Sequence, residues 1–204
     1  MNSTITPRTY RAIYRLLNRV SPVDFDCGML CDSICCTCTY EPEDVEYTAE
    51  GDVNADSYMG LYLLPGEEKV HPFKDGEPAR SDWLDWGHIL AEDYEFPESW
   101  SGKVWFLQCK NPPHCNRALR PIQCRTFPLS PHIDESDKLH LILNCDELPY
   151  ECPLIFEDYP LNDNFIRATY TVWKHLIRDA SIRDLIREDS KFREECDADI
   201  KIIL

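Results

Sequence analysis

Five of the eleven cysteines in this 204-residue chain lie within twelve residues, in the segment DCGMLCDSICCTC. Thiols packed this densely bind metal, react or form disulfides, and each of these uses restricts the path of the backbone. A second set of cysteines follows far downstream. The two sets are Cys27, Cys31, Cys35, Cys36 and Cys38, and then Cys109, Cys115, Cys124, Cys145 and Cys152. Two separated sets in one small chain predict a thiolate metal site that ties distant segments together.

A disulfide framework is the first alternative, since dense cysteines are typical of small secreted domains. The first twenty residues, MNSTITPRTYRAIYRLLNRV, contain no apolar run with a small-residue cleavage site. Their arginines and lack of acids would also suit a transit peptide, but an amphipathic helix accounts for them better. An odd number of cysteines would leave one thiol unpaired. We therefore expect reduced, metal-binding cysteines and a cytoplasmic location.

The acidic composition limits the classes of partner. The chain has 37 acidic and 21 basic residues, a net charge of −16. A nucleic-acid groove or an anionic membrane surface is bound through concentrated basic residues, so this balance argues against both. No stretch approaches the roughly 20 apolar residues of a membrane span. We expect a metal ion as partner, no nucleic acid and no membrane, and the sequence leaves a protein partner open.

Apolar residues at helical spacing predict helices near both ends of the chain. Residues 7–20 are expected to form a helix capped by Thr6, with a stripe of Tyr10, Ile13, Tyr14 and Leu17. A second helix is expected to start near residue 162, and Ser181 is expected to cap a shorter third helix. The stripe of the second helix is Phe165, Ile166, Thr169, Val172, Trp173, Leu176 and Ile177.

Fewer segments of the sequence have the pattern of a β-strand. Residues 103–108 and 138–143 are expected to form strands, and the tail at 198–204 fits a last strand. Residues 58–64 fit a strand or a short helix. Residues 66–102 are rich in Pro, Gly, Asp and Glu and are expected to be irregular, packed by tryptophans.

These elements predict one α+β domain over residues 1–204. We expect a small sheet, flanking terminal helices, and long irregular loops rich in Cys and Pro around a metal site. Residues 160–204 are expected to be the mainly helical C-terminal part. A chain of this length can build a core that does not depend wholly on metal.

The spacing Cys27-x3-Cys31-x3-Cys35 constrains what the first set can hold. On a continuous helix Cys27 and Cys35 would lie about 12 Å apart, too far for one ion. The segment therefore either curls around one centre or serves two nearby centres. Adjacent side chains usually point apart, so Cys35 and Cys36 favour two centres. Zinc and iron–sulfur clusters both take about four such ligands, so the residue types do not separate them.

A second spacing, Cys31-x3-Cys35-x2-Cys38, matches the three-cysteine motif of radical-SAM enzymes. Those enzymes need a barrel of alternating strands and helices, with the motif after the first strand. This chain has no such alternation and its motif follows a helix, so we interpret the match as coincidence.

Other residues have weaker grounds as ligands. His114 abuts Cys115, yet a surface or hydrogen-bonded role is more common for a histidine. Asp24 and Asp26 are expected to form hydrogen bonds rather than to ligate, and Cys196 is expected to be a bystander. The sequence leaves open whether the following are ligands: Cys38, Cys109, Cys145 and His114.

The segment CNRALRPIQCRTFPL, together with CGMLCDSICC, resembles the YkgJ-type cysteine-cluster proteins. That family combines a clustered CxxCxxCC with a downstream C…RPxxCRxFP and a late cysteine. Here the resemblance spans about residues 24–155, and the gaps in the first cluster are three residues long. The matching positions are Cys27, Cys31, Cys35, Cys36, Cys115, Arg120, Pro121, Cys124, Arg125, Phe127, Pro128 and Cys152.

The family is described as zinc- or iron-chelating, so the resemblance implies a metal-binding region over residues 24–155. It implies zinc or iron, as a mononuclear ion or an iron–sulfur cluster, in a structural or carrier site. A flagellin lysine methylase carries a similar cluster, which implies as the alternative an iron–sulfur or iron-dependent enzyme of methyltransferase type. The implied metal ligands are Cys27, Cys31, Cys35, Cys36, Cys115, Cys124 and Cys152.

Two arginines beside Cys124 have a physical reason to be there. Thiolate sites carry net negative charge, and hydrogen-bond donors around them tune the ligands. Arg120 and Arg125 can donate to sulfur or to backbone carbonyls. The alternative is that both pair with the many surface acids.

Overall fold

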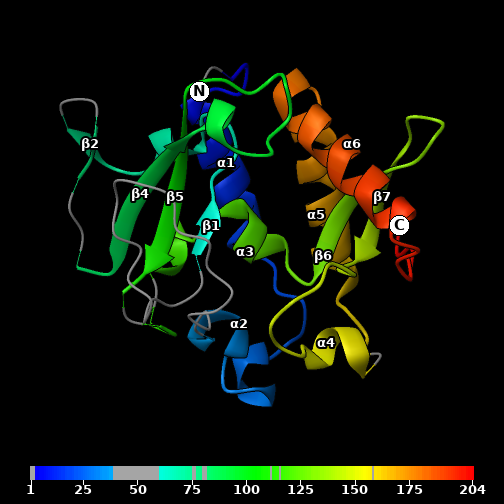
Figure 1. Cartoon of the computed structure of the whole chain (residues 1–204). Helices are drawn as coiled ribbons and strands as arrows, with labels where there is room; N and C mark the ends of the chain where they lie inside the picture. Colours follow the sequence, from blue (N-terminus) through cyan, green and yellow to red (C-terminus); the bar gives the residue numbers. More distant parts are fainter. Residues whose placement is uncertain are drawn as a thin grey trace.

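A computed structural model describes residues 3–38, 60–74, 77–79, 82–110, 112–114, 116–157 and 159–204. The predicted fold class is confirmed in its coarse form: the chain is α+β, with small antiparallel sheets and helices near both ends (Figure 1). Within the described residues, no helix is both long and apolar enough to cross a membrane.

The first helix, α1 (Pro7–Leu17), confirms the predicted stripe. The side chain of Thr6 accepts a hydrogen bond from the Thr9 N–H at 3.2 Å, as a helix cap does. The helix ends at Leu17, three residues before the predicted end. All four stripe residues, Tyr10, Ile13, Tyr14 and Leu17, are buried.

The larger sheet has three antiparallel strands in the order β1-β5-β4. The predicted strand at 103–108 is confirmed as β5, and the segment at 58–64 contains a strand, not a helix, among its described residues. The expectation of wholly irregular structure at 66–102 is wrong, because β4 pairs with β5 along its full length. The strands are β1 (Gly60–Tyr62), β4 (Leu84–Leu90) and β5 (Lys103–Cys109). A separate two-stranded ladder joins β2 (Phe73–Lys74) to β3 (Glu77–Pro78).

A hairpin of β6 (Leu129–Ile133) and β7 (Leu139–Leu143) carries the C-terminal helices. The helices α5 (Asp163–Leu176) and α6 (Ala180–Glu195) both pack against it. Asp179 caps α6 by accepting the Ile182 N–H at 3.3 Å, so the predicted cap at Ser181 is wrong. The tail lies beside β7, where backbone hydrogen bonds flank one isolated bridge from Ile142 to Ile202, so it extends the hairpin without forming a full strand.

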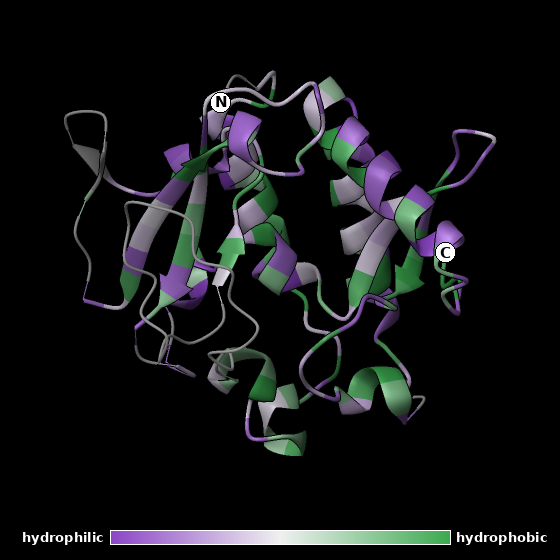
Figure 2. Cartoon of the chain, in the orientation of Figure 1, coloured by the Kyte–Doolittle hydropathy of each residue, from purple (hydrophilic) through white to green (hydrophobic). Residues whose placement is uncertain are grey.

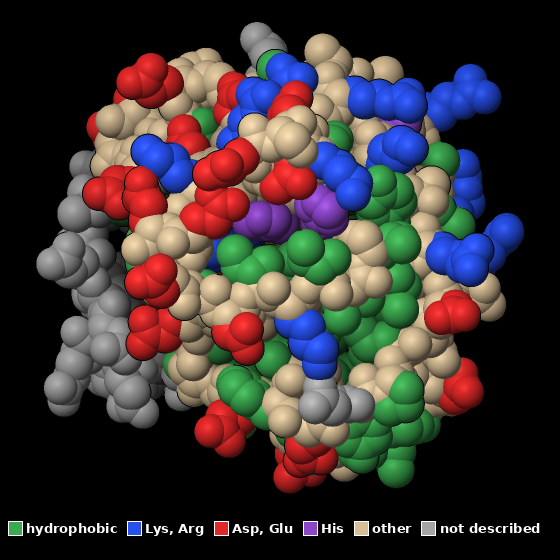
Figure 3. All heavy atoms as spheres, turned by 90° about the vertical axis from the view of Figure 1, so that its right-hand side faces the viewer, with side chains coloured by type: hydrophobic (Ala, Val, Ile, Leu, Met, Phe, Trp, Pro, Cys, Tyr) green, Lys and Arg blue, Asp and Glu red, His purple; other side chains and the backbone are tan. Residues whose placement is uncertain are grey.

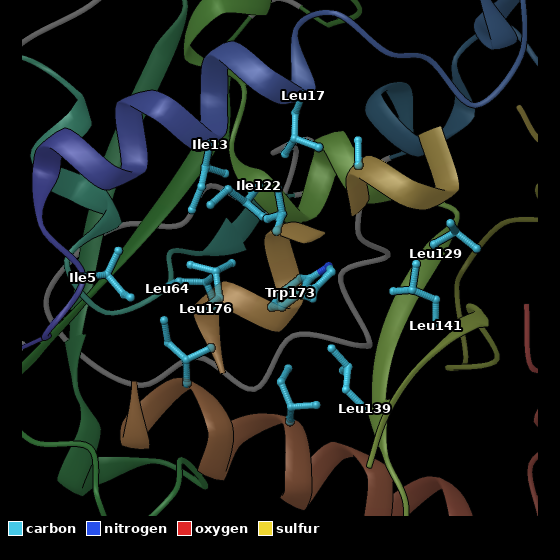
Figure 4. Close-up of a cluster of buried hydrophobic side chains, with 14 of the residues drawn as sticks. Ile5, Ile13, Leu17, Leu64, Ile122, Leu129, Leu139, Leu141, Trp173 and Leu176 are labelled. Carbon is cyan, nitrogen blue, oxygen red and sulfur yellow. The ribbon is translucent and has the colours of Figure 1, made fainter. Parts of the chain in front are cut away.

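The main core lies between α1, the hairpin and the C-terminal helices. Trp173 of α5 is fully buried there, in the same cluster as Ile13 and Leu17 of α1 and Ile122 of α3 (Ile122–Thr126) (Figure 4). Apolar and polar residues alternate along α1 and the C-terminal helices (Figure 2), and the buried residues of α1 are all on its apolar stripe. On the face that carries α6 and β7, acidic and basic side chains are interspersed, and hydrophobic atoms gather below them (Figure 3).

The remaining helical segments are short. Two of them, α2 and α4, lie at the bottom of the molecule in Figure 1, below α3. α2 and α3 contain cysteines, and Cys152 directly precedes α4. These segments are α2 (Ile34–Thr37), α4 (Pro153–Phe156) and the 3-10 helices η1 (Cys27–Leu30), η2 (Glu67–Val70), η3 (Ala91–Asp93) and η4 (Arg117–Leu119).

A buried carboxylate joins three of these elements. Glu67 of η2 is fully buried and accepts hydrogen bonds from the Tyr14 hydroxyl at 2.7 Å, from the Ile122 N–H at 2.8 Å and from the Leu64 N–H at 3.2 Å. Complete burial raises the pKa of Glu67, although these donors oppose the shift. A buried polar group of this kind is stabilising only because its acceptors are satisfied.

Replacing this carboxylate should therefore destabilise the fold. We expect Glu67→Ala to lower the free energy of unfolding by about 3 kcal/mol or more, because it leaves three buried donors without acceptors. Denaturant unfolding measures this directly. Glu195→Ala is the control, since Glu195 forms only an exposed pair with Lys191, and it should change stability by less than about 0.5 kcal/mol. Equal effects of the two substitutions would contradict the argument.

Candidate metal centre

The first cysteine segment curls instead of forming one helix. The side chain of Asp26 accepts the Gly28 N–H at 3.1 Å and caps η1. Asp32 and Ser33 then take left-handed backbone conformations, with φ of 50° and 58°, and α2 starts immediately after them. A Cβ on Gly28 would lie 2.2 Å from the Ser33 hydroxyl oxygen, so any larger residue there would force the Ser33 side chain to turn away.

The curl brings Cys35 and Cys36 to the same side. Their Sγ atoms lie 3.9 Å apart. The expectation that these neighbours point apart is therefore wrong. Two sulfurs bound to one zinc at about 2.3 Å in a tetrahedron are separated by roughly 3.8 Å. The pair thus already has the separation of two ligands on a single ion.

The second set approaches the first from two short helices. Cys124 lies in α3 and is exposed, whereas Cys152 is the N-cap residue of α4 and is buried. Cys152 packs in a small apolar cluster with Val23 and Leu154, and Cys27 is packed against the same cluster. Cys115 lies outside the described residues.

The thiols of the two sets influence one another's pKa values. Donation of its proton to Cys36 raises the pKa of Cys35, and desolvation and the neighbouring Cys124 and Cys27 raise it further. Desolvation raises the pKa of Cys152, and the nearby Cys31 adds to the effect. The structure therefore brings six predicted residues into one region: Cys27, Cys31, Cys35, Cys36, Cys124 and Cys152.

Tyr150 is a functional candidate that the sequence analysis missed. Burial raises the pKa of its hydroxyl, and so do four neighbouring cysteines, Cys35, Cys152, Cys124 and Cys36. The ring packs edge-on against Phe127. The sequence could have indicated Tyr150 through its position two residues before Cys152, because residues next to a metal ligand often shape the surroundings of the metal.

Arg125 fixes the position of Cys124 through the backbone. Its guanidinium donates to the carbonyl of Arg120, to the carbonyl of Arg117 at 2.7 Å and to the side chain of Asn18 at 2.5 Å. It also lies over the Tyr14 ring, 4.4 Å from the centroid. Of the two roles predicted for this arginine, donation to backbone carbonyls is the one found.

Arg120 serves the cysteines differently. Burial raises the pKa of Cys27, and the positive charge of Arg120 partly offsets that rise. The same charge lowers the pKa of Cys36 and so favours its thiolate. A cavity of about 70 Å³ opens beside it, lined in part by Cys27 and Cys124. Arginines thus line one side of the cysteine region, whereas the cysteine segments 24–38 and 144–157 themselves carry acidic and no basic residues.

The residues whose role as metal ligands the sequence left open fall into two groups. The Sγ of Cys38 lies 3.9 Å from the carbonyl oxygen of Pro149, next to Tyr150. Cys109 packs instead with the large sheet, and Cys145 lies near Arg193 of α6. The exposed residues His114 and Cys196, and Asp24, whose carboxylate accepts from Asn162 at 2.9 Å, show no part in the cluster.

All ten cysteines that the structure describes are free thiols. Among those same residues, no three side chains of Cys, His, Asp or Glu are arranged as a ready-made metal site. The sulfurs are gathered but do not yet surround a common point.

Comparison with known proteins identified no relative of this chain. No family model matches the chain, and no curated protein and no solved structure matches it. The resemblance to the YkgJ-type proteins therefore stays a prediction from the residues quoted above.

The role of Arg125 can be tested by its closest analogue. We expect Arg125→Lys to lower the free energy of unfolding by about 2–4 kcal/mol, because a lysine cannot satisfy the separated carbonyls that the guanidinium fork reaches. Arg15→Lys, at an exposed position on α1, should change it by less than about 0.5 kcal/mol. A loss below about 1 kcal/mol for Arg125→Lys would show that the network is not structural.

Proposed function

We propose that this protein binds zinc or iron through its clustered cysteines, in a site of structural or carrier type. The observation that carries the proposal is the Cys35–Cys36 pair, whose 3.9 Å Sγ separation matches two ligands of one tetrahedral ion. The pool of ligands is Cys27, Cys31, Cys35, Cys36, Cys124 and Cys152, together with Cys115, which lies outside the described residues.

The gathered sulfurs fit such an ion chemically. Cys27 and Cys152 are desolvated, and their raised pKa values mean that they are protonated without a metal. A bound cation supplies the positive charge that keeps neighbouring thiolates together. The ligand pool exceeds the four positions of one tetrahedral ion, so it also accommodates a second ion or a cluster.

The alternative is an iron–sulfur or iron-dependent enzyme of methyltransferase type. One feature favours it: the cavity beside Cys27 and Cys124 gives a small molecule access to the cysteines. A purely structural site is normally closed, whereas a catalytic one keeps an open side. A metal site without disulfides also agrees with the expected cytoplasmic location.

Metal content tests the proposal. Protein purified without oxygen should contain zinc or iron in stoichiometric amount by elemental analysis, and a brown colour would indicate an iron–sulfur cluster. The Cys35→Ser/Cys36→Ser double variant should lose most of this metal, because it removes the paired donors. Cys196→Ser is the matched control and should keep it, since Cys196 is exposed at the end of α6.

Two outcomes would contradict the proposal. The first is wild-type protein, prepared without oxygen, that stays free of metal even after incubation with zinc or ferrous iron. The second is equal metal content in the double variant and the Cys196→Ser control, which would show that Cys35 and Cys36 are not ligands.

Metal removal should disorder the site locally. The segments 24–38 and 144–157 contain only short helical turns and no strand, so hydrogen exchange there should rise when a chelator strips the metal. The helices α1, α5 and α6 should stay protected, because the main core packs them independently of the cysteines. Complete unfolding would show that metal holds the whole fold, and unchanged exchange would show that the cysteines hold no ion.

A further inference from the structure

The thiols of Cys35 and Cys36 are close together and open to solvent. Their Sγ atoms lie 3.9 Å apart, Cys35 is exposed, and Cys36 is half-buried. No residue of α2, which carries both, is buried. Accessible thiols with a second thiol within reach are the ones that oxidise to disulfides, whereas buried structural cysteines are inert. This pair is therefore open to an oxidation from which the buried Cys152 is shielded.

The backbone of α2 decides whether the two sulfurs can bond. A disulfide joins its sulfurs at about 2.0 Å and usually links Cα atoms about 4.4–6.8 Å apart, whereas consecutive Cα atoms are only about 3.8 Å apart. The bond therefore cannot form while α2 keeps its helical backbone. Oxidation of this pair requires the turn to unwind.

Little holds α2 in its helical form. Its N-cap residue Ser33 makes no capping hydrogen bond through its side chain and has a left-handed backbone, with φ of 58°. The Cys38 N–H donates to the Ile34 carbonyl at 2.9 Å and closes a single turn of four residues. One turn without buried side chains has low local stability, so it can open while the main core stays folded.

We propose that a peroxide joins Cys35 and Cys36 in a reversible disulfide, and that this bond unwinds α2 and releases the bound ion. One thiol first reduces hydrogen peroxide, which gives a sulfenic acid and one water. The second thiol then attacks that sulfur, and its proton leaves with the hydroxyl group as a second water. Two thiols and one peroxide thus give one disulfide and two waters, so the sulfurs supply the two electrons that reduce the O–O bond.

Release of the ion is the part of this inference that rests on the proposed function. The thiolate is the form of cysteine that binds metal, and the sulfurs of a disulfide have lost that negative charge. The disulfide therefore removes two ligands at once. A thiol reductant breaks the bond by exchange and restores both ligands. The protein would hold its ion under reducing conditions and give it up to an oxidant.

The test uses the full chain, purified without oxygen and loaded with zinc, and hydrogen peroxide as the oxidant. A chromogenic chelator should record release of most of the zinc, and dithiothreitol should allow the zinc to rebind. After alkylation of the remaining thiols, a protease that cleaves before aspartate releases residues 32–43, whose cysteines are Cys35, Cys36 and Cys38. That peptide should carry one alkyl group, on Cys38, and lack the two thiol hydrogens of the joined pair.

Two variants and one further measurement show which thiols react. Cys36→Ser should not form the disulfide. Cys38→Ser is the matched control, because it removes the third thiol of the same peptide and should still form the bond between Cys35 and Cys36. Hydrogen exchange of the α2 amides should rise on oxidation, because the turn has to unwind.

The zinc and disulfide readouts separate this inference from the proposed function. Protein that keeps both its zinc and its reduced thiols under peroxide overturns the inference and leaves the metal proposal standing. A disulfide that requires Cys38, or one that forms while the zinc stays bound, also overturns the inference. Metal-free wild type that joins Cys35 to Cys36 would support the disulfide while the metal proposal fails.

Discussion

The buried contacts of Arg125, Tyr14 and Glu67 hold the cysteine region to the rest of the fold. Arg125 reaches the last turn of α1 through the Tyr14 ring and Asn18, while the Tyr14 hydroxyl donates to Glu67, which accepts the first N–H of α3 from Ile122. These contacts form a closed ring from α3 to α1 to Glu67 and back to α3, because Arg125 itself belongs to α3. One end of α1 leads into the first cysteine segment and α3 contains Cys124, so this loop of contacts sets how far apart the two sets lie.

The cysteine segments themselves depend on local devices more than on core packing. Side-chain caps at Asp26 and Asn116 start their short helices, and the left-handed residues Asp32 and Ser33 turn the chain back. Their small apolar cluster contains only Val23, Cys152 and Leu154 as buried members, far fewer than the main core. Segments of this kind have low local stability, which a metal ion bound between them would raise.

Sequence reasoning succeeded where the signal is local. The stripes of α1 and α5 follow the helical period, and β5 and β7 have strand-like composition. It failed for β4, whose sequence LDWGHIL forms a strand because β5 lies beside it. At the site, the sequence singled out the clustered cysteines, but it could not reveal that the Sγ atoms of Cys35 and Cys36 lie 3.9 Å apart within α2, or that Arg125 would bind carbonyls. The contacts of Arg125 depend on segments far apart in the chain, since its guanidinium reaches both Asn18 and Arg117.

Access to the sulfurs distinguishes the possible uses of such a site. A site that only stabilises a fold gains from burying every ligand, since buried thiolates are shielded from exchange and oxidation. Here Cys152 is buried, but Cys35 and Cys124 are exposed, and a basic cavity opens next to Cys124 and Cys27. Burial on one side and access on the other suit a centre that exchanges its ion or meets a small molecule. If the proposed site holds an ion, this asymmetry favours the carrier type of the proposal over the structural type.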